Sequence, residues 1–321
     1  MKQQLVVLDE SFVEEHLDMK TCVDLMAQTL ENVETGEDVQ YLRTAIKMPN
    51  DNILGLMPGY SNAGYFGTKI LSVYLQNSQE GYPSHQGQIL IFEKEHGQLK
   101  GVVDATSVTQ LRTGAVSAAA SKVLANPDSA SLALLGAGEQ GESHLQALLT
   151  QFPLEQVTVW DKNFERAQEF ARKENEKYPV SVTACQTSQE AVKDADIICT
   201  LTPAKTPIIE ADWLKSGVHI NAVGACTPDS RELAADIVKQ ARFFGDNEES
   251  VMHEAGDFLL PLADGLITKD HFLGTIGQVL QGEISGRLNK KDITVFEALG
   301  MAVEDLAVAN YLCQVANNLE E

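Results

Sequence analysis

The chain has 321 residues, a length that favours two domains, and its 44% hydrophobic and 22% charged residues are ordinary for a globular protein. Its 24 lysines and arginines stand against 46 aspartates and glutamates, and the net charge of −22 disfavours nucleic acids and anionic membrane surfaces as partners. No run of about 18 apolar residues occurs and acids interrupt the N-terminal segment, so we expect neither a membrane span nor an export signal. The five cysteines lack CxxC pairing, which predicts no disulfide framework, no metal site and a cytoplasmic location.

Residues 41–104 contain short apolar or alternating runs separated by turn residues, a pattern typical of strands. The runs cover residues 41–48, 52–57, 68–75, 88–93 and 101–103. Because no helical stretch lies between them, we expect an antiparallel sheet, preceded by an amphipathic helix over residues 17–32.

From residue 131 onward, strand patterns alternate with helical ones, and an alanine-rich helix over residues 109–124 leads into this region. The expected strands cover residues 131–135, 156–160, 180–185, 196–201, 218–223 and 241–244, and the expected helices cover 142–149, 164–174 and 188–194. This alternation predicts a parallel sheet of about six strands with helices on both faces. Apolar residues recur every three or four positions in the last segment, residues 293–319, which predicts a helix there.

The sequence Gly-Ala-Gly-Glu-Gln-Gly at residues 136–141 follows the apolar strand 131–135 and begins a helix, the context in which GxGxxG binds a dinucleotide. Gly136 permits a tight turn, Gly138 lets the backbone approach a pyrophosphate, and Gly141 permits close packing of the helix on the strand. We therefore predict a doubly wound Rossmann domain.

Asp161 ends the strand after the glycine motif, about 20 residues later, where a carboxylate can accept hydrogen bonds from a ribose. An acid at this position favours NAD, whereas the nearby Lys162 and Arg166 leave NADP open as an alternative. Ligands of such sheets bind beyond the carboxyl ends of the strands. The later strand ends that would line this crevice are Thr200 and Thr202, and Val223 and Gly224.

Further motifs are Gly-Thr-Lys-Ile at 67–70, Pro-Ser-His-Gln-Gly at 83–87, Leu-Arg-Thr-Gly-Ala at 111–115, Leu-Gly-Ala-Gly-Glu-Gln at 135–140, Ile-Asn-Ala-Val-Gly-Ala at 220–225, Arg-Glu-Leu at 231–233 and the segment 293–305. On these motifs the chain resembles, over nearly its whole length, the ornithine cyclodeaminase and mu-crystallin family. That family also includes archaeal-type alanine dehydrogenases, ketimine reductases and pyrroline-2-carboxylate reductases.

The resemblance implies a homodimer built on the first domain, and a C-terminal helix that returns to that domain. The expected fold is therefore α/β, with a Rossmann doubly wound parallel sheet over residues 119–298. A smaller, discontinuous α+β domain for substrate binding and dimerisation is expected over residues 1–118 and 299–321.

The resemblance also implies the site residues. Lys69 and Arg112 would be catalytic, both would bind the substrate carboxylate together with Arg43, and Leu299 would lie with Ala298 at the mouth of the site. The implied cofactor positions are Ser84, Arg112, Ala137, Gly138, Gln140, Asp161, Thr202, Val223 and Gly224, to which the glycine motif and the strand end add Gly136, Glu139 and Thr200.

Physical reasoning about the basic residues is compatible with these roles. Arg112 would lie in the first turn of its helix, where the helix dipole disfavours a cation, so it needs an anion such as a substrate carboxylate, a pyrophosphate or an acid of the protein. Lys69 lies in an apolar strand, where desolvation would lower its pKa, although a lysine that faces outward is the alternative. Lys47 is an alternative to Arg43 as the basic residue of the site, because the register of their strand is not fixed by the sequence. His85 is expected to be an ordinary hydrogen-bonding residue.

One position departs from the cyclodeaminase pattern. Cyclodeaminases resembling this chain carry an acid/base aspartate after Val-Gly-Gly, where this sequence has Cys226, and a thiol cannot replace an ionised carboxylate. Asp229 is a candidate substitute. We therefore expect an NAD(P)H-dependent reductase of small imino or keto acids, such as pyrroline-2-carboxylate or the imine in alanine dehydrogenase chemistry. The alternatives are an ornithine cyclodeaminase that forms proline and ammonia, and a non-catalytic nicotinamide-dependent binding protein.

Overall fold

The chain folds as two compact units, of which the first comprises residues 1–112 and 300–321 and the second comprises residues 113–299. The computed structural model describes residues 5–74, 76–77, 82–83 and 85–320. The boundary at residue 112 falls inside a helix, so one continuous helix belongs to both units.

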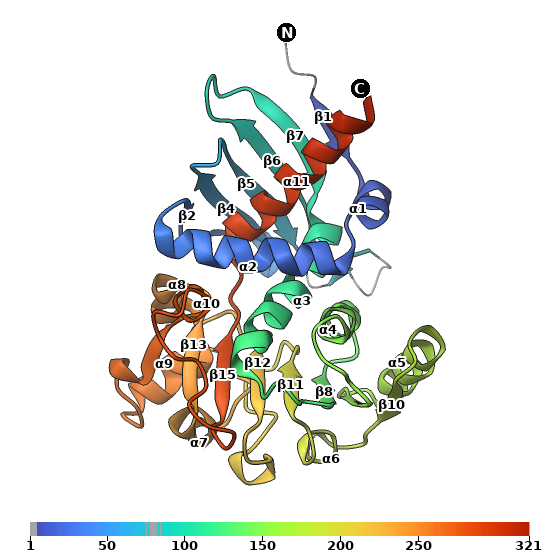
Figure 1. The fold of residues 1–321 in the computed structure, drawn as a ribbon, viewed down its shortest axis with the longest axis vertical. Helices are drawn as coiled ribbons and strands as arrows, with labels where there is room; N and C mark the ends of the chain where they lie inside the picture. The colour runs from blue at the N-terminus through green and yellow to red at the C-terminus, as the bar shows by residue number, and fades with distance from the viewer. Residues whose placement is uncertain (1–4, 75, 78–81, 84, 321) are drawn as a thin grey trace. The chain divides into compact units, whose positions relative to one another are not determined.

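The first unit is a sheet with helices on one face (Figure 1). Its strands follow the order β1-β7-β6-β5-β4-β2, with β3 also paired to β4. The predicted antiparallel sheet is present, and β1 was missed because this three-residue strand has no alternating pattern and pairs in parallel with the distant β7. The elements are β1 (Val6–Leu8), α1 (Glu10–His16), α2 (Met19–Thr35), β2 (Asp38–Gln40), β3 (Thr44–Lys47), β4 (Ile53–Ser61), β5 (Tyr65–Val73), β6 (His85–Glu93), β7 (Leu99–Asp104), the start of α3 (Ala105–Leu124) and α11 (Ala302–Glu320).

Helix α11 packs against β4, β5 and β6 and against α2. Two glycines on the inner face of the sheet permit this close approach. A Cβ atom at Gly67 would lie 2.8 Å from Leu306 Cδ2, and one at Gly101 would lie 2.4 Å from Cys313 Sγ. The residues that alternate with these glycines therefore point to the opposite face.

That opposite face, which we call the open sheet face, carries half-buried apolar side chains. Within it the rings of Phe66 and Phe92 stack with their centroids 5.2 Å apart. Its members include Leu54, Leu56, Phe66, Ile70, Leu90 and Phe92.

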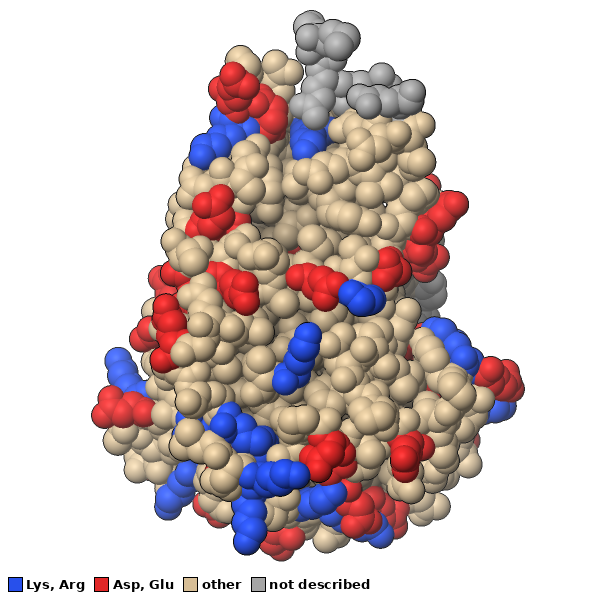
Figure 2. Space-filling view, viewed as in Figure 1, with Lys and Arg blue, Asp and Glu red and all other residues tan. Residues whose placement is uncertain are grey.

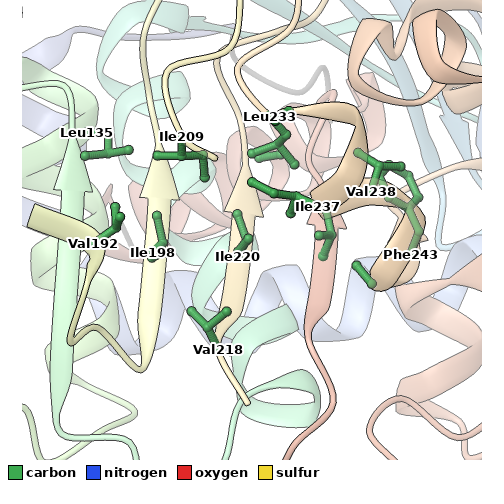
Figure 3. Close-up of a cluster of buried hydrophobic side chains, with 14 of the residues drawn as sticks. Leu135, Val192, Ile198, Ile209, Val218, Ile220, Leu233, Ile237, Val238 and Phe243 are labelled. Carbon is green, nitrogen blue, oxygen red and sulfur yellow. The ribbon is translucent and has the colours of Figure 1, made fainter. Parts of the chain in front are cut away.

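The second unit contains an eight-stranded parallel sheet in the order β10-β9-β8-β11-β12-β15-β13-β14. Its strands are β8 (Ser131–Leu135), β9 (Gln156–Trp160), β10 (Ser181–Ala184), β11 (Ile197–Thr200), β12 (His219–Ala222), β13 (Arg242–Gly245), β14 (Phe272–Thr275) and β15 (Thr294–Glu297). Its helices, besides the remainder of α3, are α4 (Glu139–Leu149), α5 (Phe164–Lys177), α6 (Ser188–Val192), α7 (Ala235–Gln240), α8 (Glu248–Glu254), α9 (Gly256–Ala263) and α10 (Ile276–Leu280). A buried apolar cluster joins the strands to the helices and loops that cover them, and Figure 3 shows Ile198, Ile209, Ile220 and Leu233 within it.

The prediction of one helix over residues 293–319 is wrong in its first part. Residues 294–297 form β15, which lies between β12 and β13, and α11 begins only at Ala302. All four residues of β15 are buried, including the polar Thr294 and Glu297, so the strand shows no alternation of buried and exposed positions that would distinguish it from a buried helix.

No helix in the described part of the chain is long and apolar enough to cross a membrane. Figure 2 shows acidic and basic side chains interspersed on the viewed face.

Candidate active site

Four buried charged side chains of the first unit form a connected group, which we call the charge cluster: Lys69, Arg112, Glu304 and Asp305. Nζ of Lys69 lies 2.7 Å from Oδ2 of Asp305. Nε of Arg112 donates to Oδ1 of Asp305 at 3.0 Å, and Nη1 donates to Oε2 of Glu304 at 2.9 Å. Lys69 is 4% exposed, Arg112 5% and both carboxylates 0%, so the cluster is shielded from water.

Three elements bring the cluster together. Lys69 lies on the inner face of β5, in the alternating row that also contains Gly67, and this face is covered by α11. Glu304 and Asp305 occupy the first turn of α11, where the helix dipole stabilises negative charge.

Arg112 lies further along its helix than the sequence predicts. Helix α3 begins at Ala105 rather than at Thr109, and the carboxylate of Asp104 accepts the Ser107 N–H at 2.8 Å, as an N-cap residue does. Arg112 is therefore about two turns from the start, beyond the reach of the dipole at the helix terminus. The anions that it contacts within the first unit are Glu304 and Asp305.

Burial and ion pairing shift the pKa values of Lys69 and Asp305 in opposite directions. The pKa of Lys69 is lowered to about 8, chiefly by burial. The positive charges of Arg112 and Arg43 act in the same direction, and the adjacent Asp305 carboxylate acts against them. Burial alone would raise the pKa of Asp305, but Arg112 and Lys69 outweigh it and hold this pKa below its usual value. The result is an ionised carboxylate beside a lysine whose proton is more easily released than that of a lysine in water.

Lys69 retains the capacity to bind a further acceptor. Its ammonium contacts Asp305, and it donates to Thr109 Oγ1 at 3.3 Å. An ammonium has three N–H donors, so the described partners leave one for another acceptor.

Arg43, in the segment between β2 and β3, approaches the same end of α11. Its Nη2 donates to the carbonyl oxygen of Gly300 at 3.0 Å. Gly300 has a φ of +80°, and a Cβ atom there would lie 2.8 Å from Nη1 of Arg112. Both guanidinium groups thus lie close to Gly300, where a larger residue would strain the backbone and displace the Arg112 guanidinium group.

Residues 136–141 of the second unit, which we call the glycine turn, have the geometry that a dinucleotide requires. Gly136 has a φ of +126°, which glycine adopts readily, and its N–H donates to Trp160 O at 2.8 Å. A Cβ atom at Gly141 would lie 2.7 Å from Gly136 O, so only glycine permits this packing of α4. Gly138 is the N-cap of α4 without a side-chain cap, and the nearest atom to a Cβ built there is Arg166 Nη2, at 3.7 Å. The helix N-terminus is thus open to an anion.

Asp161 lies at this turn. Its Oδ2 accepts the N–H of Ala137 at 3.1 Å, and its Oδ1 accepts the N–H of Asn163 at 2.9 Å. Glu139 and Gln140 form the first turn of α4. The structure therefore brings together, within the second unit, the predicted cofactor residues of the glycine motif and Asp161.

The other predicted cofactor residues of this unit lie at the ends of neighbouring strands. Thr200 ends β11, and its carbonyl oxygen accepts the N–H groups of Val223 at 3.0 Å and Gly224 at 3.1 Å, just beyond β12. Thr202 follows Thr200 on the same loop. Ser84 lies outside the described residues.

Leu299 belongs to the second unit, whereas the other predicted substrate residues belong to the first. It is buried, and its N–H donates to Oδ2 of Asp246 at 2.7 Å. Ala298 is also buried and donates its N–H to Ala222 O at 2.8 Å.

A model of the ornithine cyclodeaminase/mu-crystallin family matches residues 3–320. The chain belongs to this family. A ketimine reductase mu-crystallin from Mus musculus is 38% identical over 315 residues, which cover 96% of each protein.

Solved structures of high similarity support this assignment. One is the structure of Δ1-pyrroline-2-carboxylate reductase from Thermococcus litoralis in complex with NADH and L-proline. It has a TM-score of 0.95 at 29% identity, and the match covers 98% of both chains. That of an archaeal alanine dehydrogenase dimer with bound NAD has a TM-score of 0.93 at 28% identity and covers 99% of this chain and 97% of the other.

Cys226 of this member of the ornithine cyclodeaminase/mu-crystallin family is half-buried in the loop after β12. Its Sγ donates to the carbonyl oxygen of Val223 at 3.2 Å. Asp229, the candidate substitute for the missing aspartate, accepts from Thr227 Oγ1 at 2.8 Å within its own turn. Among the described residues, no group of three or more histidines, cysteines and carboxylates is arranged to hold a metal ion.

Glu304 and Asp305 were not among the predicted site residues. They are two adjacent acids at the start of a helix whose remaining residues are mostly apolar. Acids in that position are commonly explained by their favourable interaction with the helix dipole alone. The signal that could have identified them is the requirement that buried Lys69 and Arg112 be paired with carboxylates.

Proposed function

We propose that this protein is an NAD(P)H-dependent reductase of small imino acids, with cyclic ketimines such as pyrroline-2-carboxylate as its substrates and alanine dehydrogenase-type chemistry as the related reaction. The observation that carries the proposal is the charge cluster, in which a buried lysine with a lowered pKa shares Asp305 with Arg112. The second guanidinium group, that of Arg43, contacts Gly300, which also lies beside Arg112. The relatives named as ketimine and pyrroline-2-carboxylate reductases support this choice.

When bound, the nicotinamide cofactor supplies the hydride that reduces the C=N bond. The residues of this chain would hold it through the glycine turn, where the open N-terminus of α4 suits a pyrophosphate and Asp161 suits a ribose. Arg43 and Arg112 would bind the substrate carboxylate through their planar guanidinium groups. Lys69 would donate a hydrogen bond to the substrate or a proton to its nitrogen.

The position of Cys226 favours reduction over cyclodeamination. A cyclodeaminase must oxidise an amine, release ammonia, close a ring and return the hydride, which requires an acid/base group in the site. The Cys226 thiol is engaged with the Val223 carbonyl group, and a thiol lacks the permanent charge of the aspartate that it replaces. An imine reductase needs only to bind and orient an electrophile for hydride transfer.

The test is an assay of the purified protein with NADH and, separately, NADPH, against pyrroline-2-carboxylate and piperideine-2-carboxylate. Ornithine with NAD⁺ in an ammonia-release assay is the control. We expect cofactor oxidation with the ketimines and no ammonia from ornithine. Ammonia and proline from ornithine would establish a cyclodeaminase. No turnover with the ketimines or ornithine would contradict the reductase of cyclic ketimines and favour the non-catalytic binding protein.

We expect Asp161→Ala to weaken the preference for NADH over NADPH. The substitution removes the carboxylate that would bind the ribose and repel a 2′-phosphate, so the ratio of kcat/KM values for the two cofactors should fall by about tenfold or more, an effect of the size of one charged hydrogen bond. Asp212→Ala, which removes an acid of the same unit outside the glycine turn, is the control. An unchanged ratio in D161A would contradict the ribose role.

We further propose that the protein is a homodimer that pairs through the open sheet face, and that it resides in the cytoplasm. The archaeal alanine dehydrogenase dimer supports the oligomeric state. The apolar character of the open sheet face supports the proposal that the dimer interface lies there. The five cysteines are free thiols, which suits a reducing compartment.

Phe66→Glu is expected to convert the dimer to a monomer. Two symmetry-related carboxylates would be placed in an apolar interface, and their burial is unfavourable. The molar mass would be measured by light scattering after size-exclusion chromatography. Leu288→Glu is the control, because Leu288 is a 65% exposed leucine of the second unit. A dimer that persists in F66E would place the interface elsewhere.

A further inference from the structure

One buried carboxylate of the second unit, that of Glu232, joins the loops after β11 and β12. Its Oε1 accepts the N–H of Thr202 at 2.8 Å and the hydroxyl of Thr202 at 2.6 Å. Its Oε2 accepts the N–H of Gly224 at 2.9 Å. Burial raises the pKa of Glu232 to about 7, whereas the hydrogen bonds from Thr202 and Gly224 act against this rise and favour the ionised form, which accepts at both oxygens and holds both loops.

Glu232 lies in the same loop as Gly224, and its backbone is held by α9 and by Ile208, whose N–H donates to the Glu232 carbonyl oxygen at 2.8 Å. Oδ1 of the buried Asp257, on α9, accepts the N–H groups of Glu232 at 3.0 Å and Leu233 at 2.8 Å. The Leu233 side chain belongs to the apolar cluster of this unit (Figure 3). The carboxylate therefore has an anchored backbone and acts on the loops from a fixed position.

The two loops pack closely around the Glu232 carboxylate, and the N–H groups of Val223 and Gly224 also donate to Thr200 O. A Cβ atom at Gly224 would lie 2.1 Å from the Thr202 carbonyl oxygen and 2.6 Å from Oε2 of Glu232. Thr202, Gly224 and the carboxylate thus occupy one tightly packed space.

The strand order shows which half of a dinucleotide these loops would serve. In the sheet the neighbouring strands lie in the order β9-β8-β11-β12. The glycine turn follows β8 and Asp161 follows β9, whereas Thr202 and Gly224 follow β11 and β12, on the other side of β8. A dinucleotide in a doubly wound sheet lies across the point where the strand order reverses. If the adenosine ribose lies beside Asp161, the nicotinamide half extends toward the ends of β11 and β12.

We propose that Glu232 is a positioning residue for the nicotinamide half of the cofactor, because it holds the Thr202 and Gly224 loops in place at the ends of β11 and β12. This inference rests on the proposed function, and it adds a residue that touches neither the glycine turn nor Asp161 in the structure.

Glu232→Gln tests the requirement for two acceptor oxygens. Glutamine has one acceptor oxygen and one NH₂ donor, so in either orientation its NH₂ group faces a backbone N–H of Thr202 or of Gly224. The substitution keeps the size of the side chain and removes at least one loop contact. A buried hydrogen bond to a charged group corresponds to about a ten- to hundredfold change in an equilibrium constant.

The experiment is a fluorescence titration of the purified full chain with NADH, and a calorimetric titration with ADP-ribose, which lacks the nicotinamide half. We expect E232Q to raise the Kd for NADH by about tenfold or more and to leave the Kd for ADP-ribose within about twofold of the wild-type value. Glu174→Gln is the matched control, because Glu174 is a buried glutamate of α5 in the same unit, and both of its Kd values should be unchanged.

Several outcomes would overturn the proposal. Unchanged NADH binding in E232Q would show that the loops need no carboxylate, and an equal loss of NADH and ADP-ribose binding would show a general structural role. Failure of the wild-type protein to bind NADH would instead contradict the proposed function. If E232Q does not fold, Glu232→Asp is measured in its place, because the shorter side chain keeps the charge and cannot span both loops.

Discussion

Replacing Asp305 with alanine is expected to destabilise the folded protein by about 3–5 kcal/mol, the usual effect of removing one partner from a buried ion pair. Asp305 is fully buried and lies 2.7 Å from Nζ of Lys69 and 3.0 Å from Nε of Arg112. Its loss would leave both cations in a space closed to water, with Glu304 still paired to Arg112 and no carboxylate in contact with Lys69 among the described residues.

The free energy of unfolding would be measured by urea denaturation followed by circular dichroism. The control is Asp24→Ala, which breaks the ion pair of Lys20 and Asp24 on α2. That pair has the same 2.7 Å separation as Lys69 and Asp305, but its side chains are 74% and 62% exposed. Water solvates the lysine that D24A leaves behind, so we expect no measurable change. Equal stability of D305A and the wild-type protein would mean that the buried pair contributes nothing to the fold.

Lys69→Met is expected to lower turnover by about 10²–10⁴-fold, the contribution typical of a positioned proton donor, and to leave the protein folded. Methionine has a similar length and suits a buried site, and Asp305 keeps its contact with Arg112. Lys100→Met is the matched control, because Lys100 lies on β7 of the same sheet and its Nζ donates to Asn310. Turnover in K100M should stay within about twofold of the wild-type value, because the half-buried Lys100 contacts Asn310 rather than the charge cluster. Wild-type rates in K69M would remove Lys69 from the mechanism.

The same residue predicts a pH dependence of reduction. The pKa of Lys69 is lowered to about 8, so the lysine is protonated below pH 8 and neutral above it. If Lys69 donates a proton, kcat/KM should be constant below this pH and should fall tenfold per pH unit well above it. The groups that face it are Asp305, Arg112 and Arg43. The residual activity of K69M should lack this fall, and the presence of an identical fall would assign the titration to another group.

Most of the fold of the second unit was predictable from local signals, although its sheet has eight strands rather than the expected six or so. The glycine turn, the acid at the end of β9 and the alternation of strands and helices each depend on residues close together in the sequence. The contact of Asp161 with Ala137 agrees with the expectation that this acid lies at the turn. β15 was missed because its position between β12 and β13 depends on pairing with distant segments, and a buried run of four residues carries no period of its own.

The charge cluster was predictable only in part. The apolar strand alone favoured a Lys69 that faces outward, and the family resemblance reversed this expectation in favour of burial and a lowered pKa, which the structure has. Arg112 needs an anion, as expected, but the stated reason was wrong, because the helix begins earlier and the residue lies away from its first turn. Its partners Glu304 and Asp305 are 192 and 193 residues away in the sequence, a separation that spacing rules do not cover.

The interruption of the first unit by the second has a consequence for synthesis on the ribosome. Lys69 and Arg112 leave the ribosome well before Glu304 and Asp305, so the nascent first sheet lacks these two carboxylates and the cover that α11 provides while the whole second unit is being made. The second unit has all of its strands once residue 297 has emerged, and it can fold as a unit at that stage. A chain truncated between residues 299 and 302 and released from the ribosome would therefore contain a complete dinucleotide fold attached to a sheet that lacks its final helix, and we expect such a chain to be a preferred substrate of chaperones and proteases.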